Sequence, residues 1–309
     1  MDSKLHVSAS PHIHSARTTQ SIMLDVVIAL LPAAIAGVIL FGLSALAVIV
    51  CCVAGSVLSE FVFNLLLKKE QTVGDLSAVV TGLLLALNLP ANVPLWQAGV
   101  GSVFAIIVVK CLVGGLGHNL VNPAITARVF MLVAFGSMAQ AAFPLDAVAG
   151  ATPLVELAAG NSPSLMDLFL GKTGGAIGET CTLALLIGGI YLLCRRVIQW
   201  HLPVAFIGTV FLFTLALVGF DFVTALAWTL SGGLFLGAIF MATDYVTSPA
   251  TPLGMFVFGV LAGVLTVVIR FFGNYPEGVS FAILFMNIMT PFIDKWTARK
   301  PFGTGGVKA

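Results

Sequence analysis

The stretch IMLDVVIALLPAAIAGVILF at residues 22–41 is followed after two residues by SALAVIVCCVAGSVLSEFVFNLLL at residues 44–67. Each stretch is as long as the ~20 apolar residues that an α-helix needs to cross a bilayer. Asp25 and Glu60 are the two charged residues within them. The pair therefore predicts two consecutive transmembrane helices.

The composition extends this prediction to the whole chain. Hydrophobic residues make up 59% of the sequence and charged residues 9%, whereas a soluble domain carries about 25% charged residues. So few charges cannot cover a water-facing surface, so lipid must contact most of it. The net charge of +1 produces no field that attracts nucleic acid. We expect an all-α polytopic membrane protein without a nucleic-acid partner.

Apolar segments recur along the rest of the chain and predict about ten transmembrane helices. They lie at 22–41, 44–67, 76–89, 95–113, 123–142, 180–194, 203–219, 222–243, 254–272 and 278–293. Segments 76–89 and 180–194 are shorter than a simple span, and segment 222–243 is followed by Asp244. Short or polar-interrupted spans indicate discontinuous helices that line a site.

An internal repeat is indicated by the positions of these segments. A constant offset of 155 residues superposes the first five segments on the last five. Because five is odd, the second unit must enter the membrane from the opposite side, which predicts two inverted five-helix repeats with a site where they meet. The expected divisions are an N-terminal segment 1–20, a first repeat 21–142, an external loop 143–179, a second repeat 180–294 and a tail 295–309.

Basic residues predict the orientation. With ten spans and a cytoplasmic N-terminus, 11 of the 14 Lys and Arg residues are cytoplasmic, two are external and Arg128 lies within a span. The two external residues are Lys172 and Arg270. We therefore expect a multi-pass protein of the cell membrane with both termini in the cytoplasm.

The sequence GGLGHNLVNP at residues 114–123 is the first candidate site. Its glycines let a backbone approach a ligand closely, and Asn119 has amide groups that could recognise a planar heterocycle. Asn122 and Pro123 suit the N-cap and first turn of a helix. A capped turn between two spans explains the same residues, and the residues alone favour that interpretation.

Acidic residues near the spans form a second set of candidates. Asp244 ends an apolar segment, where a carboxylate is unfavourable unless it is paired, hydrated or bound to a cation. It lies either on a cation path or at a helix end in headgroup water. Asp25 and Glu60 pair with Lys110 or Arg128, or belong to an ion path, and the sequence does not choose between these possibilities.

The third candidate site is DAVAGATPL at residues 146–154, within the expected external loop. Pro153 favours an extended conformation of Thr152. The small residues Gly150 and Ala151 leave the threonine hydroxyl accessible. The segment is either a site of modification or a plain loop.

Four motifs together resemble a known family. They are GHNLVNPAITARVF (117–130), DAVAGATPL (146–154), FMATD (240–244) and YPEGVSFAILFMNIMTPFID (275–294). They are similar to those of the RnfD membrane subunit of the Rnf complex, an ion-pumping ferredoxin:NAD oxidoreductase, and of its relative, the NqrB subunit of the sodium-pumping NADH:quinone oxidoreductase. The resemblance covers nearly the whole chain.

The resemblance implies two flavins. One is flavin mononucleotide (FMN), joined through its phosphate to Thr152 by a flavin transferase that also recognises Asp146, Gly150 and Ala151. The other is a non-covalent riboflavin on the cytoplasmic side, with Asn119 and Asn122 as its matching residues. This sequence differs from the family pattern at Ala149, where Ser or Thr is common.

The resemblance also implies a function. The chain is expected to be a flavoprotein subunit of an electron transport complex that couples electron transfer between ferredoxin and NAD to sodium or proton movement. It has no nicotinamide motif, and its five cysteines form no CxxC pair, so we expect it to act only with other subunits and to bind no metal. A solute channel or transporter with inverted repeats and no redox cofactor is the alternative.

Overall fold

The computed structural model describes residues 17–135, 142–144, 151–161, 163–273 and 278–298. Over these ranges the secondary structure is helical apart from one isolated bridge between Ala142 and Gly175, which confirms the all-α class. The first half contains α1 (Thr19–Phe41), α2 (Leu43–Leu66), the 3-10 helix η1 (Val73–Asp75), α3 (Ser77–Leu87), α4 (Leu95–Val103), the π-helix η2 (Phe104–Cys111) and α5 (Pro123–Ala134). The remainder contains α6 (Pro153–Ala158), α7 (Leu165–Leu170), α8 (Thr182–Cys194), α9 (His201–Leu217), α10 (Phe222–Leu230), α11 (Leu234–Leu236), the π-helix η4 (Gly237–Met241), α12 (Pro252–Phe272) and α13 (Val279–Thr297).

The first helical pair is joined at Gly42. Thr18 caps α1 by accepting a hydrogen bond from the Ser21 N–H. Gly42 ends this helix with φ +73° and donates its N–H to the Val38 carbonyl. A residue with a side chain adopts this backbone conformation only with strain. The chain therefore reverses at a glycine, and α2 follows at once.

Helix length and composition agree with a membrane protein. Among the described residues, three helices are long and apolar enough to cross a membrane, α1, α2 and α12. The count rises to four if α10 and α11–η4, which are bent by 64° at a short break, form one span. Large apolar side chains such as Ile39 (73% exposed) and Leu43 (81% exposed) cover the outside. The expected number of ten spans stays a prediction.

The expected discontinuous helix at residues 222–243 is present. Its two parts are separated at Ser231, Gly232 and Gly233. Gly232 has φ +71°, and an added Cβ would lie 2.8 Å from Leu154 Cδ1 and 3.2 Å from Arg270 Nη2. The break thus depends on a residue without a side chain. By contrast, α5 ends at Ala134, well before residue 142, because Phe135 is extended.

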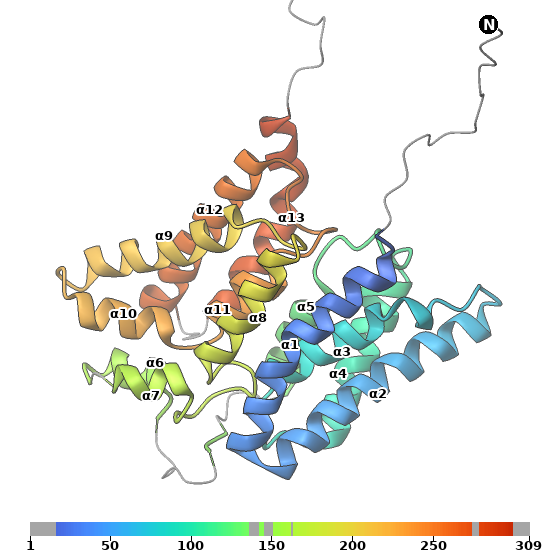
Figure 1. Ribbon diagram of the computed structural model, residues 1–309, viewed down its shortest axis with the longest axis horizontal. Coiled ribbons are helices and arrows are strands. Elements are labelled where there is room, and N and C mark those ends of the chain that lie inside the picture. Colours follow the sequence, from blue (N-terminus) through green and yellow to red (C-terminus); the bar gives the residue numbers. More distant parts are fainter. Residues whose placement is uncertain (1–16, 136–141, 145–150, 162, 274–277, 299–309) are drawn as a thin grey trace, which may run out of the picture.

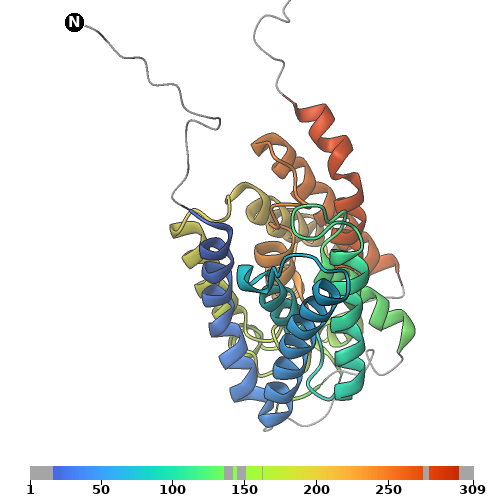
Figure 2. The same cartoon turned by 90° about the vertical axis from the view of Figure 1, so that its right-hand side faces the viewer.

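The two halves of the chain pack side by side (Figures 1 and 2). α1 of the first half contacts α8 of the second, and α5 contacts α13. Within the second half, α9 packs along α12. The largest buried cluster of apolar side chains includes residues from both halves. The halves therefore share one core.

The described part of the expected external loop is folded against the bundle. Leu154, Leu157 and Leu168 of α6 and α7 pack on Ala227 and Trp228 of α10. The N–H groups of residues 177 and 178 then donate to the carbonyls of residues 89 and 87, after α3. The described residues 151–161 and 163–179 therefore contain two short helices that bury apolar side chains against the bundle.

The bundle has two distinct ends. α1 begins and α13 finishes at one end, while α6 and α7 lie at the other (Figure 1). Gly171, which follows α7, is close to Leu40 in the last turn of α1. The part of α1 between Ile22 and Leu40 spans about 27 Å at 1.5 Å per residue. Features near Ile22 and features near α6 are thus separated by most of a bilayer.

Candidate functional site

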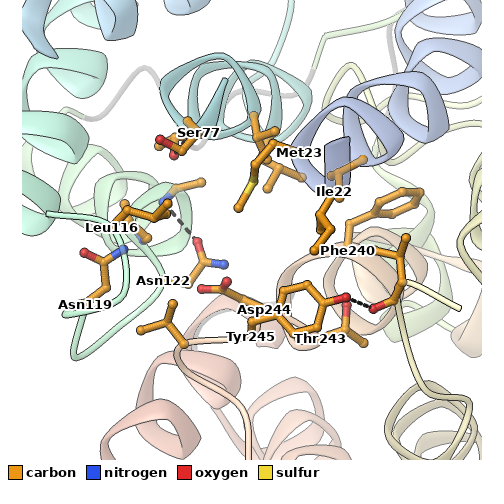
Figure 3. Close-up of a pocket in the computed structure, with 18 of the residues that line it drawn as sticks. Ile22, Met23, Ser77, Leu116, Asn119, Asn122, Phe240, Thr243, Asp244 and Tyr245 are labelled. Carbon is orange, nitrogen blue, oxygen red and sulfur yellow. Dashed lines mark hydrogen bonds between the residues drawn. The ribbon is translucent and has the colours of Figure 1, made fainter. Parts of the chain in front are cut away.

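A cavity lies at the end of the bundle where α1 begins. It contains about 770 Å³ of space between atoms, part of which is open to the outside. Its described lining includes Ile22, Met23, Val26, Ser77, Val80, Thr81, Leu84, Lys110, Leu116, Asn119, Asn122, Pro123, Ala124, Leu192, Val197, Ile198, Phe240, Thr243, Asp244, Tyr245 and Val246. Figure 3 shows the polar residues facing the cavity from different segments. Both halves of the chain therefore build one site.

The glycine-rich turn forms one wall of this cavity. Gly114, Gly115 and Gly117 have positive φ angles of 139°, 90° and 89°, and the Gly115 N–H donates to the Lys110 carbonyl at 2.9 Å. These angles suit glycine and disfavour other residues. The turn carries the chain from η2 to α5 and brings Asn119 and Asn122 to the cavity.

Asn119 and Asn122 have different roles in this wall. Asn122 Oδ1 accepts from the Ala124 and Ile125 N–H groups, and its Nδ2 donates to the Met241 carbonyl at 3.2 Å. It is thus the expected N-cap of α5, and it also ties this helix to η4. Asn119 is 8% exposed, and its buried Oδ1 has no hydrogen-bond partner among the described residues. A buried amide without a partner is unfavourable and needs a ligand or water.

Asp244 faces the cavity from the chain that leaves η4 (Figure 3). It follows the last residue of the broken span, Met241, and its Oδ2 accepts from the Thr247 hydroxyl at 3.2 Å. Desolvation by the surrounding protein raises the pKa of its carboxyl above the ordinary 3.8, although the hydrogen bond from Thr247 opposes this shift. Tyr245 donates from its hydroxyl to the Val197 carbonyl, which links this segment to the α8–α9 turn.

The pairing of the buried acids, left open by the sequence, is settled by the packing. Lys110 Nζ lies 2.9 Å from Glu60 Oε1 and 3.0 Å from Oε2, so Glu60 pairs with Lys110 and not with Arg128. Asp25 pairs with neither residue. It accepts from Tyr191 at 2.9 Å and from Arg195 Nε at 3.2 Å. Each of the two acids thus forms an ion pair with a basic residue, and each pair joins separate helices.

The threonine of the third candidate site lies at the opposite end of the bundle. Thr152 is extended at φ −68° and ψ 154°, as Pro153 predicts, and it is the residue before α6. Its side chain makes no capping hydrogen bond to that helix, and it is half-buried beside the exposed Ala151. The hydroxyl is therefore not occupied as a helix cap. Asp146 and Gly150 lie outside the described residues.

Arg270 lies in the protein interior. The distribution of basic residues predicted that it lies on the external side of the membrane. It is 6% exposed and lies in the last turn of α12. It donates to the Trp228 carbonyl at 2.8 Å and to the Ser231 carbonyl at 3.0 Å. Because the last carbonyls of a helix have no partner within it, Arg270 satisfies the end of α10 at the break. In the sequence, the signal for this role was a single basic residue at the end of an apolar segment.

Taken together, the apolar helical bundle and its bent helix pair define a polytopic membrane protein with a cavity at one end. The chain belongs to the NQR2, RnfD, RnfE family, whose model matches residues 6–303.

Relatives similar in sequence are named as D subunits of ion-translocating oxidoreductase complexes. The chain is 50% identical to the D subunit of the Na(+)-translocating ferredoxin:NAD(+) oxidoreductase complex of Acetobacterium woodii, over 98% of this chain and 97% of the relative. It is 40% identical to the D subunit of the proton-translocating ferredoxin:NAD(+) oxidoreductase complex of Clostridium ljungdahlii, over 96% of each chain. It is 36% identical to the D subunit of an ion-translocating oxidoreductase complex of Vibrio atlanticus, over 96% of this chain and 99% of the relative.

Proposed function

We propose that this chain is the membrane flavoprotein subunit of an ion-translocating oxidoreductase complex that couples electron transfer between ferredoxin and NAD to ion movement. The observation that carries the proposal is the 50% identity, over 98% of the chain, to a relative named as the D subunit of such a complex. The other subunits of the complex and the surrounding lipid are its partners. It acts as part of this complex and not alone.

FMN bound to Thr152 is the first part of the proposal. The hydroxyl makes no capping bond, and its segment is extended beside exposed Ala151, which supports access by a flavin transferase. A phosphoester there would tether the flavin next to the bundle, and a tethered ligand keeps a high effective concentration.

Riboflavin in the cavity is the second part. Asn119 lines the cavity, and its buried Oδ1 without a described partner suits a ring N–H donor of a flavin. Asn119 would orient the ring, whereas Asn122 would hold the wall by its bonds to α5 and Met241. The flavin supplies the electron-transfer chemistry, and the protein supplies position and electrostatics.

The topology is proposed to comprise ten spans in two inverted repeats, in the cell inner membrane, with both termini cytoplasmic. Adding the offset of 155 residues makes α1 overlap α8, α2 overlap α9 and α5 overlap α13, with helix ends that differ by up to 8 residues. The first and last helices of the two repeats then pack in related pairs, α1 with α8 and α5 with α13. Such pairing across an axis supports an inverted repeat.

An ion path through this subunit is proposed to use Asp244. Its carboxylate lines the cavity beyond the broken helix, and an acid at such a depth is typical of ion pathways. One relative is named for sodium and another for protons.

In-gel fluorescence of the denatured subunit tests the proposal. A covalent flavin predicts a fluorescent band at the 32.2 kDa mass of this chain after coexpression with a flavin transferase. The alternative, a solute transporter without redox cofactor, is favoured by the broken span and cavity alone. A colourless purified complex with no fluorescent band would support that alternative and reject the flavoprotein.

A further inference from the structure

A buried ion pair stands beside the cavity. Lys110 and Glu60 are each 1% exposed. The ammonium donates to both Glu60 oxygens, and to Ser77 Oγ at 2.6 Å. All three of its protons thus have acceptors, as a buried ammonium requires. Glu60 also accepts from the Thr72 hydroxyl at 2.6 Å, so the pair is held from several elements.

The two members of the pair are placed differently relative to the cavity. Lys110 and Ser77 are among the residues that line it, whereas Glu60 lies behind them. A ligand in the cavity is therefore closer to the positive charge than to the negative one. In surroundings of low dielectric constant this difference makes the contribution of the pair to the potential at the ligand positive.

We propose that Lys110 is the residue that stabilises negative charge on the reduced form of the flavin in this cavity, and that Glu60 keeps the ammonium charged and in position. The inference rests on the proposed flavin site. Reduced flavin carries a negative charge at neutral pH. A fixed charge near the ring is one of the ways in which a protein changes the relative stability of the oxidised and reduced forms. Lys110 is thus a positioning and tuning residue that acts on the flavin.

Other charged groups near the cavity lie on its other walls or behind Lys110 and Ser77. Asp244 is the second charged residue among the described lining, and it faces the cavity from the η4 side. Asp25 and Arg195 form a pair with both signs. Asp75 accepts from the Ser77 hydroxyl and N–H and lies behind Ser77. Lys110 is therefore the cation in direct contact with this space among the described residues.

Retention of riboflavin in two redox states tests the proposal. The purified complex would be diluted and filtered, either oxidised or reduced with dithionite, and free riboflavin would be measured chromatographically. Riboflavin lacks the phosphate of FMN, so the two flavins are distinguished. The ratio of the dissociation constants of oxidised and reduced riboflavin reports how strongly the site favours negative charge.

Four proteins give an ordered expectation. Glu60→Gln leaves the ammonium uncompensated and raises the ratio above that of the wild type. Lys110→Met removes the cation and lowers the ratio by about tenfold. The double variant Lys110→Met with Glu60→Gln replaces the pair by neutral groups of similar size, a change that buried pairs often tolerate. We expect its ratio to lie between those of the wild type and Lys110→Met. Asp221→Asn, an exposed acid at the N-cap of α10, is the control and leaves the ratio unchanged.

The outcomes separate the inference from the site on which it rests. If the wild-type complex holds no riboflavin, the flavin site and this inference are both rejected. If riboflavin is bound and the double variant has the wild-type ratio, Lys110 has a purely structural role and the inference alone is overturned. The double variant serves this purpose even if Lys110→Met fails to assemble, because it contains no unpaired buried charge.

Discussion

Arg270 on α12 donates a hydrogen bond of 3.0 Å to the carbonyl of Ser231, the residue at which α10 ends. Together with the bond to Trp228, it satisfies the end of a half-helix deep in the protein. The break at Gly232 and Gly233 is therefore a supported feature of the fold, since irregular backbone at membrane depth requires partners from the protein itself.

Replacing Arg270 is expected to destabilise the protein. Arg270→Met keeps the apolar stem and leaves the two carbonyls without their donor, which costs about 2–6 kcal/mol at about 1–3 kcal/mol per buried group. Thermal unfolding of the purified complex would show a lower Tm. Arg196→Met, at an exposed arginine, is the matched control and should leave the Tm unchanged. Equal Tm values for both variants would contradict the capping role.

Thr152→Val is expected to abolish the fluorescence of the denatured subunit, because valine has nearly the same shape and lacks the nucleophilic oxygen. The complex should still assemble, since the Thr152 side chain makes no capping bond to α6. Ser164→Ala offers a control in the same region. Ser164 also precedes a short helix without a side-chain cap, and its removal should leave the fluorescence intact. Persisting fluorescence in the Thr152→Val protein would place the flavin elsewhere.

The two asparagines of the cavity are expected to behave differently. Asn119→Leu should lower the extractable riboflavin severalfold with little change in stability, because its Oδ1 has no described protein partner. Asn122→Leu removes the cap of α5 and should cost about 0.5–2 kcal/mol. Chromatographic flavin content and Tm would be measured on both. A folded Asn119→Leu complex with full riboflavin would show that this amide does not hold it.

Asp244→Asn is expected to lower ion uptake per electron transferred while flavin content stays constant. The complex would be reconstituted into vesicles and the two rates compared. Asp221→Asn, at an exposed acid that caps α10, is the control for loss of a charge. Equal coupling in the Asp244→Asn and wild-type complexes would make Asp244 a simple helix-end residue.

The pH dependence of stability is a second measurement on the Asp244→Asn variant. Burial raises the pKa of Asp244 in the folded protein, so its ionised form opposes folding at pH values above that pKa. The penalty falls as the pH drops through the raised pKa and is absent below the unfolded value. The variant should therefore gain in Tm over the wild type at pH 8 and lose this gain towards pH 4.

The orientation is expected to place Gly160 outside the cell membrane and both termini inside. A reporter fused after Gly160, in the segment that follows α6, should report the external side. A fusion after Ala309 is the reference and should report the cytoplasm. Cytoplasmic signals from both would reject the proposed topology and with it the external FMN.

The sequence by itself determined the class of the protein and the approximate positions of its long apolar helices, but not the short helices α6 and α7 or the early end of α5. Long apolar runs cannot leave backbone groups unpaired in lipid, so they must be helical, and local rules predicted the cap at Asn122 and the extended Thr152. The family followed from motifs within single segments.

Tertiary structure alone decided which distant residues meet. Glu60 and Lys110 are 50 residues apart, and Asp25 and Arg195 are 170 apart, so packing of separate helices selects these pairs from several that charge allows. The same packing turns Arg270 inward to the end of α10 and leaves Asn119 without a described partner. The physical reason is that helix periodicity specifies which residues share a face, whereas the contact between faces depends on the whole bundle.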